Sequence, residues 1–241
     1  MSALLLILQM VKWNIDGGEF KTGLYPDTPN ELKVNMKSQS GAYWNGIDFI
    51  GCDLVNVSNT NFENVKLSGP EIENPSALQF VDCYDMIVSG CKFNFSNLDS
   101  ISCINLNYIE TEDEIDVSSN ILYNEFNTGN NQFSTIICAG FAESVIPIMI
   151  NGNDFNSTKG NIAIFLCNVS AGVIKNNDIS NYSTGINVMS STSYVDLYNN
   201  DIDGDSSISG AGIYNGTINL GPQGEVRTGG FNEISSRSEC Q

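Results

Sequence analysis

The sequence predicts an all-β fold, a right-handed parallel β-helix in which one elongated domain winds as a solenoid of short strands. Short segments that end in a polar or small residue, then any residue, then Phe, Ile or Leu recur along the chain. An asparagine stands at the same place in the later copies. The apolar positions are mostly Ile, Val and Phe, which favour strands, and no stretch has a helical periodicity.

A chain of 241 residues is long enough for one such domain over residues 1–241, with regular repeats over about residues 47–234. The copies of the repeated segment are residues 15–20, 49–54, 88–93, 121–126, 150–155, 174–179 and 197–202, with a looser copy at 231–234. The steps between the aligned positions Cys91, Asn124, Asn153, Asn177 and Asn200 are 33, 29, 24 and 23 residues. The repeat therefore tightens toward a regular coil in the C-terminal half.

A second apolar segment precedes the first by about ten residues in the best copies and ends in a small or thiol side chain. Its copies are residues 80–83, 101–103, 136–138, 165–167 and 188–190. A third short strand is suggested by residues 185–188. Each repeat is therefore expected to supply two or three strands, separated by turns rich in Asn, Gly and Ser.

The recurring asparagine has a physical explanation in a parallel coil. Neighbouring coils lie about 4.8 Å apart, so identical residues stack and amide side chains can hydrogen-bond along the column. Asparagine also tolerates the left-handed backbone angles of turns. The predicted ladder is Asn124, Asn153, Asn177 and Asn200, with Gly18, Cys52 and Cys91 at the same place in the earlier repeats.

Two other folds compete with the β-helix. A leucine-rich horseshoe has a similar repeat length and its own asparagine ladder, but its leucine consensus is missing here. An antiparallel sandwich would fit the density of strands, but it would not explain why asparagine recurs at one place in each repeat.

The cysteines argue for packing rather than metal binding. There are seven of them, an odd number without the close pairs of a zinc site, at positions 52, 83, 91, 103, 138, 167 and 240. Those at the end of the second segment, Cys83, Cys103, Cys138 and Cys167, are expected to form an inward stack. Buried thiols are favoured there, with disulfides as the alternative. The chain contains no histidine, which excludes His-based acid/base chemistry and argues against zinc, haem or copper.

Loops and ends interrupt the coil. An acidic insertion loop is predicted near residues 107–118, and shorter loops near residues 25–29 and 221–224. The apolar run Ala3–Leu8 is too short for a membrane span and lacks the basic flank of a signal peptide. It is interpreted as a buried strand or as the point where a longer surface protein was cut, with any signal sequence upstream. Neither end has a clear capping element.

The formal charge of −18, from 28 acidic and 10 basic residues, argues against nucleic acid and anionic membranes as partners. A partner, such as a polysaccharide or another chain of a surface assembly, would be neutral, cationic or bridged by a metal. The alternative is that the charge serves only solubility.

The stacked Asn-Asn-Asp-Ile pattern of residues 176–179 and 199–202 resembles the repeat of pectin-lyase-like right-handed β-helix proteins, including the NosD-like parallel β-helix group. The resemblance covers about residues 47–234. It implies the fold and an extracellular, carbohydrate-facing setting. It implies no single activity, because this superfamily includes lyases, polygalacturonases, phage tailspikes and non-catalytic adhesins.

The catalytic pattern of polygalacturonases is absent, because the chain has neither histidine nor Arg-x-Lys. A lyase needs a Lys or Arg base and acidic groups or calcium to neutralise the uronate. The basic residues Lys92, Lys159, Lys175 and Arg227 stand at different places in their repeats. Lys175 and Arg227 are the catalytic candidates, with solvated surface charge as the alternative.

Two further sets of residues are candidate binding sites. Asp201, Asp203 and Asp205 alternate as in the first half of a calcium loop, but no later bidentate Glu follows, and alternation also suits a strand end. Calcium is the one candidate cofactor. Tyr182, Tyr194 and Tyr198 are candidate sugar platforms, with packing at the coil corners as the alternative. Six Asn-x-Ser/Thr sequons would carry glycans only in a secreted eukaryotic protein.

The preferred function is a non-catalytic, secreted or cell-surface β-helix module that acts as a rigid stalk or carbohydrate-facing adhesion domain. The alternatives are a calcium-assisted polysaccharide lyase that acts on acidic glycans and a trimeric, tailspike-like receptor binder.

Overall fold

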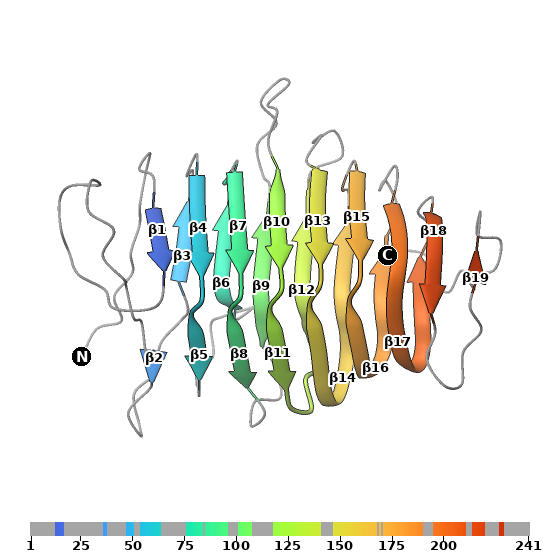
Figure 1. Ribbon diagram of the computed structural model, residues 1–241. Helices are drawn as coiled ribbons and strands as arrows, with labels where there is room; N and C mark the ends of the chain where they lie inside the picture. Colours follow the sequence, from blue (N-terminus) through green and yellow to red (C-terminus); the bar gives the residue numbers. More distant parts are fainter. Residues whose placement is uncertain are drawn as a thin grey trace.

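The computed structural model describes residues 13–16, 36–37, 47–50, 54–63, 76–83, 85–95, 101–107, 118–140, 147–167, 169, 171–189, 195–210, 214–219 and 227–228. Their strands form one continuous 19-stranded sheet that curls 301° round an axis. These residues contain no helix, and so none that could cross a membrane. The predicted all-β solenoid is confirmed (Figure 1).

The strands stack in three parallel columns. The first column contains β1 (Trp13–Asp16), β4 (Leu54–Ser58), β7 (Asp85–Ser89), β10 (Ser119–Leu122), β13 (Pro147–Asn151), β15 (Ala171–Lys175), the start of β17 (Val195–Gly210) and β18 (Tyr214–Asn219). The second contains β2 (Met36–Lys37), β5 (Asn61–Glu63), β8 (Lys92–Phe95), β11 (Glu125–Thr128) and the start of β14 (Asp154–Cys167).

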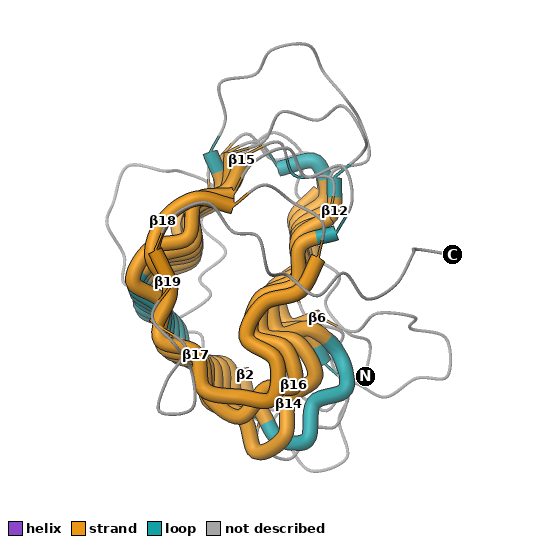
Figure 2. Tube along the Cα trace, turned by 90° about the vertical axis from the view of Figure 1, so that its right-hand side faces the viewer, coloured by secondary structure: helices purple, strands orange, loops and turns teal. Residues whose placement is uncertain are grey.

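The third column contains β3 (Ile47–Ile50), β6 (Ser76–Val81), β9 (Ser102–Asn107), β12 (Ser134–Ala139) and the end of β14. In the later coils the second and third columns merge, because β14, β16 (Asp178–Val188) and β17 each run through both. Only β19 (Arg227–Thr228) pairs antiparallel among the described strands, with β18. Seen along the axis, the coils superimpose in one elongated outline (Figure 2).

The third strand that was only suggested at residues 185–188 belongs to the end of β16 and is part of this third column. Strand β9 ends at Asn107 and β10 begins at Ser119. The predicted acidic insertion, over residues 108–117, lies outside the described residues. The N-terminal apolar run and the loops at 25–29 and 221–224 lie outside them too.

The core is built by alternation, because successive strand residues point to opposite faces of the sheet. In β8 and β11, Phe93 and Phe126 point inward between outward polar neighbours. Aromatic rings stack from coil to coil, with centroid separations of 4.7 Å for Phe62–Phe93, 5.0 Å for Phe93–Phe126 and 4.7 Å for Phe126–Phe155. The stack continues as Ile179 and Ile202, both buried. One register position is thus apolar and buried in every one of these coils.

The predicted stack of cysteines is wrong. Register pairs Cys138 with Leu106 and Leu166, while Cys167 pairs with Ala139. Cys103 precedes Ile104, which pairs with Ile136, so it lies at the level of Thr135. Cysteines that end equivalent apolar segments in the sequence therefore do not occupy the same register position in the coils. Cys103 and Cys138 are buried free thiols, as favoured over disulfides, and Cys91 is a buried free thiol as well.

The alignment of Cys52 with Cys91 is also wrong. Strand β3, which precedes Cys52, pairs with β6 in the third column, whereas Cys91 follows β7 in the first column. The residue one coil before Cys91 is Thr60, because β5 pairs Asn61 with Lys92. Thr60 is buried and small, so it satisfies the packing requirement of this place.

Candidate functional site

The chain turns from the first column into the second at a corner that the structure describes in six successive coils. We call this turn the ladder corner; each copy is a residue with positive φ followed by a buried residue. Its copies are Asn59–Thr60, Gly90–Cys91, Tyr123–Asn124, Gly152–Asn153, Asn176–Asn177 and Asn199–Asn200. Positive φ suits glycine and asparagine, which explains the residues chosen at most copies.

The inner side of the ladder corner is an asparagine column. Nδ2 of Asn153 donates to Oδ1 of Asn177 at 2.9 Å, and the backbone N–H of Asn153 donates to the same oxygen at 3.0 Å. Nδ2 of Asn153 also donates a hydrogen bond to the backbone carbonyl of Ile121 at 3.0 Å. The same bonds recur in two other coils. Asn124 donates to Asn153 in this way, and Asn177 donates to Asn200.

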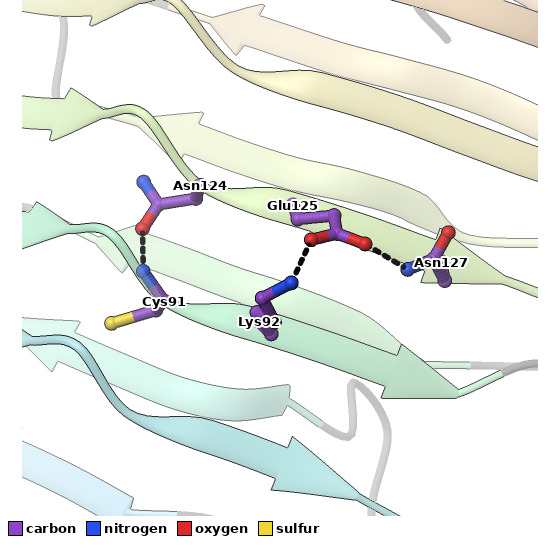
Figure 3. A network of polar contacts seen from close by, with 5 residues as sticks. All are labelled: Cys91, Lys92, Asn124, Glu125 and Asn127. Atoms are coloured by element: carbon purple, nitrogen blue, oxygen red, sulfur yellow. Dashed lines mark hydrogen bonds and ion pairs between the residues drawn. The ribbon is translucent and has the colours of Figure 1, made fainter. Parts of the chain in front are cut away.

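Every buried amide side chain of the column is hydrogen-bonded. Oδ1 of Asn153, Asn177 and Asn200 each accepts two hydrogen bonds, and Nδ2 of Asn124, Asn153 and Asn177 each donates two. At the two ends, Oδ1 of Asn124 accepts one from the backbone of Cys91, and Nδ2 of Asn200 donates one to the carbonyl of Ile174, so no side-chain nitrogen or oxygen of the column is left without a partner. Sequence separations along it fall from 33 through 29 and 24 to 23 residues. Cys91 begins the column, and its backbone N–H donates to Oδ1 of Asn124 at 2.9 Å (Figure 3).

The outer side of the ladder corner carries a second row of polar side chains, which we call the outer row: Tyr123, Asn151, Asn176 and Asn199. Nδ2 of Asn176 donates to Oδ1 of Asn151 at 2.8 Å. Nδ2 of Asn199 lies 3.5 Å from Oδ1 of Asn176, and Nδ2 of Asn151 lies 3.4 Å from the hydroxyl of Tyr123. Asn176 and Asn199 are exposed. Asn151 is buried, so the row runs along the axis and reaches the surface at Tyr123, Asn176 and Asn199.

Tyr123 is 65% exposed, the one large hydrophobic side chain in the described part of the chain that is exposed. Sequence inspection missed it, although a signal was present. In the aligned repeats, the place before the inner asparagine holds Gly or Asn in every other described copy. A tyrosine there is the departure from the pattern that points to a role other than turning the chain.

Two of the predicted site residues come together beside the outer row. Lys175 and Tyr198 are register partners in β15 and β17, and Asn151 is the partner of Lys175 in the preceding coil. Both Lys175 and Tyr198 are half-buried. The side chain of Arg227 and the whole of Tyr194 lie outside the described residues.

Tyr182 is not a sugar platform. It is 2% exposed, and its hydroxyl lies 3.1 Å from Oγ1 of Thr128 and 3.0 Å from Oγ1 of Thr135. Burial raises the pKa of this phenol. The alternative reading, packing at a coil corner, is the correct one, because the hydroxyl finds two partners in the interior.

A column of carboxylates flanks the ladder corner on the second-column side. Register places Glu125, Asp154, Asp178 and Asp201 in consecutive coils, each directly after an inner asparagine. Nζ of Lys92 lies 2.5 Å from Oε2 of Glu125, and Asn127 donates to Oε1 of Glu125 at 3.1 Å (Figure 3). The sequence contained this column too, one place after the asparagine of each repeat.

The carboxylates titrate differently along this acidic column. The hydrogen bond from Lys92 lowers the pKa of Glu125. Desolvation raises the pKa of Asp154, and repulsion from Asp178 and Glu125 adds to it. Desolvation also raises the pKa of Asp178. Desolvation first, and then the stacking of like charges at the coil spacing, thus disfavours the ionised forms of Asp154 and Asp178.

The calcium candidates lie at the end of this acidic column. Asp201 and Asp203 are exposed and flank the buried Ile202, the alternation expected of a strand. The side chain of Asp205 lies outside the described residues. Within the described residues, no group of three or more His, Cys, Asp or Glu side chains is arranged to hold a metal ion.

Comparisons with protein families, with curated proteins and with solved structures find no match to this chain. The ladder corner, with Tyr123 and the outer row on its surface, is the candidate functional site on its geometry.

Proposed function

We propose that this chain is a non-catalytic β-helix module of a secreted or cell-surface protein, which acts as a rigid stalk that carries a carbohydrate-facing adhesion surface. One observation carries the proposal: the ladder corner has two sides with different chemistry. The inner asparagines tie coil to coil, while the outer row holds an exposed aromatic ring and exposed amides along the axis.

Rigidity follows from the inner side. The hydrogen bonds of Asn124, Asn153 and Asn177 are buried and continuous, and buried polar networks that are fully satisfied fix one packing of their surroundings. The aromatic stack through Phe126 supports the next column in the same coils. Such a body transmits force and keeps its surface side chains at fixed intervals, which suits a stalk.

The distribution of charge supports a binding module rather than an enzyme. A lyase needs a base and the acid-neutralising groups within reach of one bond. Lys175 instead lies beside Asn151 and Tyr198, and the carboxylates of the acidic column follow the inner asparagines in the second column. The polar groups are spread along the axis, an arrangement that suits contact with an extended polymer.

We also propose membership of the pectin-lyase-like group of right-handed β-helices. Three parallel columns per coil and an internal asparagine ladder support it. The setting that this group implies is extracellular.

Retention on polysaccharides tests the proposed function. The purified chain is passed over insoluble cellulose, chitin and xylan and over immobilised polygalacturonate, with calcium or with a chelator. Soluble polygalacturonate is followed in parallel by the absorbance of unsaturated uronate. We expect retention on at least one matrix without formation of product. Unsaturated uronate would establish the lyase instead, and retention on no matrix would contradict the adhesion surface.

A further inference from the structure

The backbone of Tyr123 is an outlier at the surface. Its φ is 55°, in the left-handed region, where the other described ladder-corner residues at this place are Asn59, Gly90, Gly152, Asn176 and Asn199. A bulky aromatic residue in this region costs folding free energy that glycine or asparagine would not. Strain of this kind clusters at functional sites. The tyrosine therefore needs an explanation other than the turn itself.

The ring of Tyr123 is held in place although it is exposed. A Cβ at Gly152, one coil further on, would lie 2.5 Å from Cδ1 of the ring, so the ring occupies the space that this glycine leaves. Its hydroxyl lies 3.4 Å from Nδ2 of Asn151. The ring is consequently preorganised, which reduces the entropy lost when a ligand stacks on it.

The amides of the outer row have unused hydrogen-bonding capacity. Each asparagine side chain has two N–H donors and a carbonyl with two lone pairs. Asn176 donates one hydrogen bond to Asn151 and accepts a long one from Asn199. The exposed atoms of Asn176 and Asn199 can therefore bind further donors and acceptors while the row keeps its order.

We infer that Tyr123, Asn176 and Asn199 form a binding site for a neutral glycan chain that lies along the helix axis. This inference rests on the proposed function and names the ligand class of the same corner. One sugar ring stacks its C–H face on Tyr123, and hydroxyl groups of the following sugars bind the amides. Tyr123 and Asn199 stand three coil intervals apart, roughly 14 Å, so the ligand is an oligosaccharide.

The neighbouring charges favour a neutral chain. In each of these coils, the carboxylate of the acidic column (Glu125, Asp154, Asp178 or Asp201) lies two residues after the positive-φ residue of the ladder corner. This column would repel a polyanion. The outer row itself is uncharged. Lys175 lies beside the outer row and Lys92 pairs with Glu125, and these two cations balance only part of the negative charge of the acidic column.

The substitution Tyr123→Asn separates binding from folding. Asparagine is the residue at three other described copies of this place, so the free energy of unfolding should stay equal or rise. Calorimetric titration with hexasaccharides of cellulose, chitin and xylan should show at least one that binds the unmodified chain, with binding at least tenfold weaker in the variant. The galacturonate hexasaccharide, without calcium, should bind to neither.

Matched variants complete the test. Tyr123→Phe keeps the ring and should bind nearly as well, Asn199→Ala should bind more weakly, and Asn127→Ala, on the neighbouring column, should bind unchanged. Retention on polysaccharides with unaltered affinity in Tyr123→Asn would overturn this site and leave the proposed function standing. A fall in stability of Tyr123→Asn would assign the tyrosine a structural role and also overturn it. Failure of every hexasaccharide and every matrix would contradict both.

Discussion

The ring of Tyr182 passes over Gly160, its register partner in the neighbouring coil, on its way to the interior. A Cβ at Gly160 would collide with Cδ1 and Cε1 of that ring. Because Gly160 has no Cβ, the ring of Tyr182 can lie against it and place its hydroxyl beside Thr128 and Thr135. The pair lies at the irregularity where β14 and β16 cross from the second column to the third.

Gly160→Ala should destabilise the fold by about 2 kcal/mol, because overpacking forces the ring of Tyr182 off its two hydrogen bonds. Urea unfolding followed by circular dichroism measures the change. Gly172→Ala is the matched control, since a Cβ there would meet its nearest neighbours at 3.6 Å, an ordinary contact. Equal effects of the two substitutions would show that the ring of Tyr182 does not depend on the missing Cβ of Gly160.

Phe126→Ala should cost about 3 to 5 kcal/mol, because the ring lies between Phe93 and Phe155 at centroid distances of 5.0 and 4.7 Å. The loss combines removed apolar area, a cavity and two ring contacts. Phe126→Leu fills most of the cavity and should cost clearly less. Thermal unfolding of the three proteins gives the comparison, and a loss under about 1 kcal/mol for the alanine variant would be incompatible with a continuous aromatic stack.

Mild acidification should stabilise the protein. The folded-state pKa values of Asp154 and Asp178 are raised above 3.8, so the folded chain binds protons before the unfolded chain does. Stability contributed by these groups therefore rises as pH falls through the folded pKa values toward 3.8. Glu125, whose pKa is lowered from 4.5, acts in the opposite direction, because its contribution to stability is lost as pH falls below 4.5.

The melting temperature, measured from neutral pH down to 3.8, tests this pH dependence. Asp178→Asn should flatten its pH dependence and raise the value at neutral pH, and added salt should do the same by screening the acidic column. A melting temperature that falls steadily from neutral pH downward in the unmodified chain would contradict the assignment.

The buried thiols should resist alkylation. Burial raises the pKa of Cys91 to about 11 and also raises the pKa values of Cys103 and Cys138. Only the thiolate reacts with iodoacetamide, so at about pH 8 these residues should remain unmodified in the folded chain and react in urea. Peptide mass spectrometry quantifies each site. Rapid labelling of Cys138 without denaturant would place it at the surface.

Much of the fold could be predicted from the sequence, because the coil repeats the same requirement at each turn. The asparagines at 124, 153, 177 and 200 follow from the need to satisfy a buried amide in every coil. The cysteines could not be placed in the same way. A small apolar side chain fits several inward positions, so Cys103 and Cys138 satisfy packing at different registers.

The candidate site was harder to predict, because its residues are defined by departure from the repeat. Tyr182 and Tyr123 are the same residue type in similar polar surroundings of the sequence, yet one is buried and the other is exposed. Gly160 leaves the space that the buried ring of Tyr182 occupies, and Gly152 leaves the space beside the exposed ring of Tyr123. In both cases the glycine belongs to the neighbouring coil. That relationship depends on the register between coils.

A double-mutant cycle on Asn153 and Asn177 tests the stacking of coils most directly. Each single change to alanine should cost about 2 to 3 kcal/mol, because buried partners lose their hydrogen bonds. The double variant should lose less than the sum, with a coupling of about 1 kcal/mol or more, whereas Asn153 and the exposed Asn156 should be additive. Strict additivity for Asn153 and Asn177 would mean that the two side chains do not touch, and would contradict the asparagine column and the coil built around it.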